Sequence, residues 1–215
     1  MIFTLMAVGA AGVVLVWRLV AAGRVSLFAG QATLFGALGV AAVATGRVGL
    51  SPRLWWGWAL LAGAGAGVLL YVATRVFVAV VRRWPRFERH VDQIYDQRRG
   101  TMLPAALALS SAVVAPGEEL FWRGLFQGRL AVATTWLAAA LITWAVYVAV
   151  NAASGSLAIL AAAVVSGGVW GVLALWTHGV MASLACHSTW TALMVLAPPV
   201  RPVHRLGPVR ERDER

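Results

Sequence analysis

Long, uninterrupted runs of apolar residues dominate this chain of 215 residues. They fall at about residues 2–17, 27–46, 54–81, 101–130, 132–152, 156–177 and 179–197. A helix needs roughly 20 apolar residues to cross the hydrocarbon core of a bilayer, and most of these runs supply them. The first run is short, whereas the third is long enough to tilt. The pattern predicts an all-α fold, a polytopic transmembrane helix bundle with about seven spans.

One polar segment, residues 82–100, interrupts these runs. Its apolar residues recur at three- and four-residue spacing, which predicts either an amphipathic helix on the inner membrane face or a solvated connecting helix. They are Phe87, Val91, Ile94 and Tyr95. We therefore divide the chain into N-terminal transmembrane helices (1–81), a cytoplasmic amphipathic linker (82–100), a core that carries polar residues (101–197) and an Arg/Pro-rich cytoplasmic tail (198–215).

Composition and charge also indicate a lipid environment. Only 12% of the residues are charged, whereas a soluble domain usually has about 25%. The chain has 18 arginines and no lysine, and its net charge is +10. In a soluble protein such a charge would suggest nucleic acid. Here the arginines lie between and after the apolar runs, so we expect membrane lipid rather than nucleic acid as a partner.

The distribution of arginine predicts the orientation in the membrane. Thirteen arginines follow the first and third runs or lie in the tail, and four lie on the other side of the predicted bundle. Because arginine is enriched in cytoplasmic segments, we expect a cytoplasmic C-terminus in an integral cell membrane protein, with a bacterial inner membrane as the location. The residues from Met1 to Trp17 lack the basic start of a signal peptide, so we expect a retained first helix.

Two carboxylates and an arginine lie within the fourth apolar run, in Pro116-Gly-Glu-Glu-Leu-Phe-Trp-Arg-Gly124. Charged side chains inside a span are costly and are treated as functional by default. Glu119 and Arg123 are four residues apart, so they share a helix face and can pair. Glu118 lies about 100° round the helix without a local partner, which makes it a candidate general base acting on water. A structural ion-pair cluster that locks helix packing is the alternative.

His187, Thr191 and Asn151 are the other candidates for chemistry. His187 lies mid-run with Thr191 four residues later on the same face, and it can bond a carboxylate, polarise a carbonyl or bind a metal. Asn151 ends the fifth run, where its amide is a candidate donor to an oxyanion or a helix cap. The sequence does not favour a zinc site, because catalytic zinc usually has three protein ligands and only His187 is well placed to be one. Cys186, the one cysteine, is expected to be a packing residue.

Taken in order on successive spans, these residues resemble the CAAX protease and bacteriocin-processing (Abi) family of intramembrane proteases. The resemblance covers roughly residues 100–197 and is carried by Glu118-Glu119-x-x-x-Arg123, by Tyr147 with Asn151, and by His187-x-x-x-Thr191. It implies an intramembrane endopeptidase, a hydrolase acting on a peptide or membrane-protein substrate. Glu118 would then activate water, Glu119 and Arg123 would shape the site, and His187 would be the surviving histidine.

Two positions depart from the family pattern, and they leave other functions open. The family's first histidine falls on Asn151 and its final asparagine on Thr191; asparagine can donate a hydrogen bond but cannot shuttle protons or bind zinc well. We therefore expect no cofactor, with a divalent metal such as zinc as the alternative. A slow enzyme and a non-catalytic immunity or scaffold protein with the protease fold both remain possible. A third alternative is a rhomboid-type serine protease using Ser154 and His187.

Overall fold

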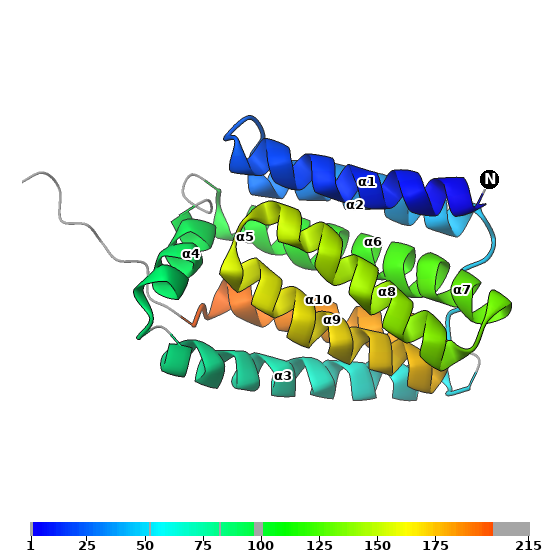
Figure 1. The fold of residues 1–215 in the computed structure, drawn as a ribbon. Helices are drawn as coiled ribbons and strands as arrows, with labels where there is room; N and C mark the ends of the chain where they lie inside the picture. The colour runs from blue at the N-terminus through cyan, green and yellow to red at the C-terminus, as the bar shows by residue number, and fades with distance from the viewer. Residues whose placement is uncertain (1, 52, 82, 97–100, 200–215) are drawn as a thin grey trace, which may run out of the picture.

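The structure is a computed structural model that describes residues 2–51, 53–81, 83–96 and 101–199. Within these ranges it is built from helices and contains no strand (Figure 1). The helices outside the fourth run are α1 (Ile2–Ala21), α2 (Leu27–Ala44), α3 (Trp56–Val81), α4 (Pro85–Asp96), α8 (Trp136–Asn151), the 3-10 turn η3 (Ala152–Ser154), α9 (Leu157–Thr177) and α10 (Met181–Leu196). The predicted all-α bundle is confirmed.

The fourth apolar run forms one continuous rod whose backbone changes character along its length. Its parts are α5 (Leu103–Leu107), the π-helical η1 (Ala108–Val114), α6 (Ala115–Glu119), the π-helical η2 (Leu120–Gln127) and α7 (Gly128–Ala133). Pro116 lies between the two π-helical parts and has no N–H to donate to the helix ladder. π-Helical turns are uncommon and often lie at functional sites, and here they flank the two glutamates.

Five of the described helices are long and apolar enough to cross a membrane: α1, α2, α3, α8 with its 3-10 extension, and α9. α10 is a shorter apolar helix. The rod from α5 to α7 and α10 run alongside the other five in the bundle (Figure 1). Together with the five candidate spans, they correspond to the seven apolar runs of the sequence. The chain is an integral membrane protein by these criteria.

Small residues allow α3 and α10 to pack closely. A Cβ atom at Gly63 would clash with the carbonyl oxygen of Ala182, and one at Gly67 would lie 2.6 Å from the carbonyl oxygen of Cys186. Gly63 and Gly67 are four residues apart and so share one face of α3. Close backbone approach of this kind is how helices associate in membranes, where lipid removes most of the hydrophobic drive for association. Cys186 is fully buried at this contact.

The linker helix α4 lies across one end of the bundle (Figure 1). Its Phe87 and Val91 are buried together with Val78 of α3, and the backbone N–H of Leu157 donates to His90 Nδ1 at 3.0 Å. The amphipathic helix is therefore docked on α3 and the start of α9. The side chains of Ile94 and Tyr95, which the sequence placed on the same face, lie outside the part that the structure describes.

The segments expected to be rich in arginine gather at this same end. The connection from α1 to α2, helix α4 and the end of α10 all lie there (Figure 1). The described arginines of these segments are Arg18, Arg24, Arg83, Arg86 and Arg89. Arg82, Arg98, Arg99 and the tail arginines lie outside the described residues, as does His204. The described arginines of this group thus lie in segments at one end of the bundle, and the cytoplasmic orientation of that end stays a prediction.

Candidate functional site

Glu118 and Glu119 lie in α6 at its contact with α2. A Cβ atom at Gly117 would clash with the carbonyl oxygen of Phe35, and one at Gly39 would lie 2.7 Å from the Cα atom of Gly117. These two glycines therefore let the backbones of α2 and α6 meet directly. The contact fixes the rotation of α6, and this rotation turns the two adjacent carboxylates toward different neighbours.

Glu119 is the centre of a buried polar network. Its Oε1 atom accepts a hydrogen bond from Arg123 Nη1 at 3.2 Å and lies 2.9 Å from His187 Nδ1. Arg123 also donates through Nη2 to the carbonyl oxygen of Gly167 at 2.9 Å. Glu119 is 0% exposed and Arg123 is 1% exposed. The i, i+4 pair expected from the sequence is present, and it joins α6, η2, α9 and α10 through charge-assisted bonds.

Aromatic rings enclose this network. The ring of Trp170 stacks on His187 with centroids 3.6 Å apart and planes 16° apart. The guanidinium of Arg123 lies 4.7 Å from the ring centroid of Tyr147 and 5.3 Å from that of Trp170. Cation–π contacts of this kind are favourable for a cation that is shielded from water. The rings therefore hold Arg123 and His187 in one orientation each.

Glu118 faces a cavity of about 210 Å³, while Glu119 lies behind its wall. The cavity is lined by side chains from α1, α2, η1, α6, α8, α9 and α10, among them Glu118, Asn151 and His187. Glu118 is 7% exposed and forms a side-chain hydrogen bond with Tyr147. Three of the residues singled out in the sequence thus meet at one cavity. Glu119 and Arg123 support it from inside the bundle instead of lining it.

The two positions that depart from the family pattern differ in their placement. Asn151 lines the cavity, where its Oδ1 accepts from the indole of Trp17 at 2.9 Å and its Nδ2 donates to the carbonyl oxygen of Tyr147 at 2.8 Å. Its amide is therefore largely committed to neighbours in the protein. Thr191 lies one turn after His187 on α10 but is absent from the cavity wall, and its buried hydroxyl has no hydrogen-bond partner among the described residues.

Several residues at the site were missed by sequence reasoning. Gln31 of α2 lines the cavity, Trp17 of α1 holds Asn151, and Trp170 of α9 stacks on His187. Gln127, one turn beyond Arg123, donates to the carbonyl oxygen of Gly171 at 3.1 Å. For the glutamines, the sequence does contain a signal, namely a polar amide inside an otherwise apolar run. Such a side chain is costly in lipid unless it has a role. Both Gln31 and Gln127 fit that description.

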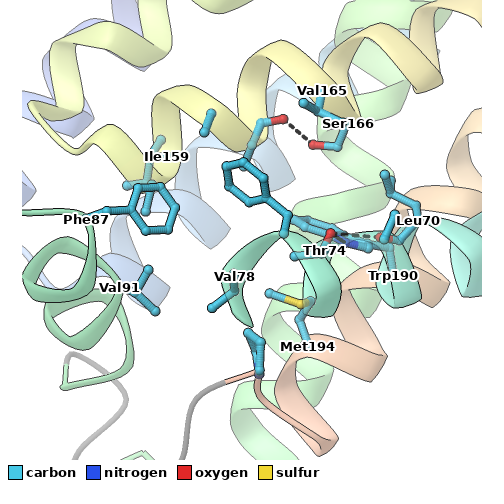
Figure 2. Close-up of a pocket in the computed structure, with 16 residues that line it drawn as sticks. Leu70, Thr74, Val78, Phe87, Val91, Ile159, Val165, Ser166, Trp190 and Met194 are labelled. Atoms are coloured by element: carbon cyan, nitrogen blue, oxygen red, sulfur yellow. Dashed lines mark hydrogen bonds between the residues drawn. The ribbon is translucent and has the colours of Figure 1, made fainter. Parts of the chain in front are cut away.

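A second cavity, of about 360 Å³, is lined mainly by apolar side chains (Figure 2). It lies between α3, α4, α9 and α10, with Phe87 and Val91 of α4 at one side and Trp190 of α10 at another (Figure 2). The indole of Trp190 donates to Thr74 Oγ1 at 3.0 Å. Ser166 and Trp190 belong to the walls of both cavities. The cavity that carries the Glu118 carboxylate and this more apolar cavity therefore share part of their walls.

The described residues do not fit a protein-bound metal well. No group of three or more His, Cys, Asp and Glu side chains that could hold a metal ion occurs among them. A catalytic zinc site needs three protein ligands, and Asn151 stands where a second histidine would be needed. Ser154, the nucleophile of the rhomboid-type alternative, is absent from the cavity wall that carries His187, and its Oγ accepts from the Ser156 N–H at 3.2 Å.

Comparison with known proteins gives one family match. Residues 100–193 match the family model described as Type II CAAX prenyl endopeptidase Rce1-like. No curated protein and no solved structure matches the chain. The matched segment contains the network of Glu119, Arg123 and His187 together with Glu118, so the resemblance read from the motifs is confirmed. Helices α1 to α4, which carry Trp17 and Gln31, lie outside the match.

Proposed function

We propose that the chain is an intramembrane endopeptidase, because residues 100–193 match the Rce1-like family model. The observation that carries the proposal is the division of labour between two adjacent carboxylates. Glu118 faces a cavity, whereas Glu119 is fully buried and neutralised by Arg123. A purely structural ion pair would need only the second of these, so the first is free to act as a base.

The proposed reaction is hydrolysis of a peptide bond by water that Glu118 activates. The Glu118 carboxylate takes a proton from the water while the water oxygen attacks the peptide carbonyl carbon. The carbon–nitrogen bond then breaks, and Glu118 passes the proton to the departing nitrogen. The products are a carboxylic acid and an amine, and Glu118 is again a carboxylate, so atoms and protons balance. No metal enters these steps, because the described donor set does not fit one.

His187 has a positioning part in this proposal. Its Nδ1 lies 2.9 Å from Glu119 Oε1, and a carboxylate held by Arg123 can only accept there. Nδ1 therefore carries the proton, which leaves Nε2 as the ring atom able to bind water or substrate. The stacked Trp170 prevents the ring from turning. Substrate peptides with apolar residues suit the site, because the neighbouring apolar cavity can receive their side chains.

A second candidate function is a non-catalytic membrane protein that keeps the protease fold. The observation in its favour is the state of Asn151, whose amide is bonded to Trp17 and to the Tyr147 carbonyl. Such a residue stabilises the wall but does not move protons. The two functions differ in one respect that can be measured, because only the endopeptidase depends on the charge of Glu118.

The test is cleavage of a peptide library from a bacterial membrane proteome by the detergent-solubilised protein, with new termini read by mass spectrometry. Glu118→Gln should reduce cleavage on the order of 10²–10⁴-fold without a loss of thermal stability, because glutamine keeps the shape and the contact with Tyr147. Glu88→Gln, at an exposed carboxylate of α4, is the matched control and should cleave normally. Equal cleavage by wild type and Glu118→Gln would contradict the proposal.

A further inference from the structure

Gln31 is a buried amide that takes part in none of the interactions described above. It lies in α2 and is 6% exposed, and it lines the same cavity as Glu118 and His187. Neither its Nε2 nor its Oε1 has a hydrogen-bond partner among the described residues. A buried amide without partners costs free energy, so its retention in an apolar helix calls for a ligand that satisfies it. α2 also lies outside the matched family segment.

Several other polar side chains in the cavity wall are committed to the protein, although the indole N–H of Trp170 has no hydrogen-bond partner among the described residues. The hydroxyls of Ser110 and Ser166 donate to carbonyl oxygens of their own helices. The indoles of Trp17 and Trp190 donate to Asn151 and Thr74. Gln127 differs from Gln31 in its donor, because its Nε2 donates to the Gly171 carbonyl oxygen, while its Oε1 also has no partner among the described residues. Gln31 therefore has a buried donor and a buried acceptor without partners among the described residues, on a side chain that lines this cavity.

A primary amide can form two parallel hydrogen bonds with one residue of an extended peptide. We propose that Gln31 binds the backbone of the substrate in this way: Nε2 donates to a backbone carbonyl oxygen, and Oε1 accepts from the N–H of the same residue. The ligand class is an extended peptide segment, because its backbone N–H and C=O groups are not occupied by helical hydrogen bonds. This inference rests on the proposed function. It adds the residue that holds the substrate backbone beside Glu118.

Backbone binding by Gln31 has a kinetic signature that a role in the chemical step would not have. Both hydrogen bonds are present in the ground state and in the transition state, so their loss raises KM and leaves kcat nearly unchanged. We expect Gln31→Met to raise KM about tenfold. The same substitution removes an unsatisfied buried amide and nearly keeps its volume, so the unfolding midpoint should stay the same or rise.

The deciding experiment measures binding without turnover. Glu118→Gln protein in nanodiscs, with and without Gln31→Met, is titrated with a capped hexapeptide of leucine and alanine and with the same peptide N-methylated along its backbone. The unmethylated peptide should bind about tenfold more weakly when Gln31 is replaced. The methylated peptide, which cannot donate to Oε1, should bind both proteins with similar affinity. Gln93→Met, at an exposed glutamine of α4, should behave like the parent.

The outcomes separate this inference from the proposed function. Equal affinity of the unmethylated peptide for both proteins overturns the role of Gln31, as does a failure to bind above empty nanodiscs. A Gln31-dependent affinity in a protein that cleaves no peptide supports the inference and removes the endopeptidase proposal. Cleavage that depends on Glu118, with a KM that is unchanged in Gln31→Met, supports the endopeptidase proposal and overturns the role of Gln31. A fall in kcat at constant KM would assign Gln31 to the chemical step and overturn backbone binding.

Discussion

Replacing Glu119 with glutamine tests the polar network most directly. Glu119 Oε1 receives Arg123 Nη1 at 3.2 Å and lies 2.9 Å from His187 Nδ1, and both ionic partners are almost fully buried. Glu119→Gln keeps the oxygen and the shape but removes the negative charge. Arg123 then remains as a buried cation that has lost its hydrogen-bonded counter-ion. Removing one partner of a buried ion pair usually costs about 3–5 kcal/mol.

The surroundings of Arg123 place the expected loss near the lower end of that range. Its Nη2 still donates to the Gly167 carbonyl oxygen, and the rings of Tyr147 and Trp170 still lie 4.7 and 5.3 Å away. These contacts continue to shelter the cation, so we expect a loss of about 3 kcal/mol. The assay is chemical unfolding in detergent followed by tryptophan fluorescence, which is informative because the chain has 11 tryptophans.

A double variant separates the charge from the packing. Glu119→Gln combined with Arg123→Met removes both charges, and buried ion pairs replaced by apolar side chains are often neutral in stability. The double variant should therefore recover to within about 1 kcal/mol of wild type. An unfolding free energy for Glu119→Gln within about 0.5 kcal/mol of wild type, the range typical of surface substitutions, would refute the reasoning. So would a double variant that is less stable than the single one.

Three further predictions follow from the fold and the charge pattern. Gly117→Ala should destabilise the protein by about 1–3 kcal/mol in the same unfolding assay, because its Cβ would collide with the Phe35 carbonyl and separate α2 from α6; Gly65→Ala, where a Cβ meets no atom within 4 Å, is the control. Metal chelators should leave peptide cleavage unchanged, and a complete loss restored by zinc would contradict this. A reporter fused after Arg215 should be active in the cytoplasm, given the excess of arginine in the segments predicted to be cytoplasmic; activity only outside the cell would contradict that orientation.

The polar residues of the core show how far sequence reasoning reached. Glu119 and Arg123 are four residues apart, and helical periodicity alone predicted their contact. Placing His187 beside Glu119 required more, because 68 residues separate them in the chain. The cost of polar groups in lipid predicts that such residues find one another but does not say which pairs form. The family resemblance supplied that expectation, and the geometry now gives the atoms involved.

The departures from expectation have the same physical origin. Asn151 was a candidate donor to an oxyanion, but its amide is bonded to Trp17 of a helix more than a hundred residues away. Thr191 shares a helix face with His187, yet its place lies outside the cavity wall. Gln31 was overlooked because one amide in an apolar run has no local signature. In each case the neighbour that decides the role comes from another helix.

The sequence by itself determined the environment and the elements of this protein. Apolar runs of about membrane thickness impose helices, because lipid offers no partner for backbone N–H and C=O groups, and charges inside those runs mark the residues worth testing. Only the tertiary structure decided which carboxylate faces the cavity. That outcome depends on the rotation of α6, which the contact of Gly117 with α2 sets, and helix rotation arises from close packing between helices that no local pattern encodes.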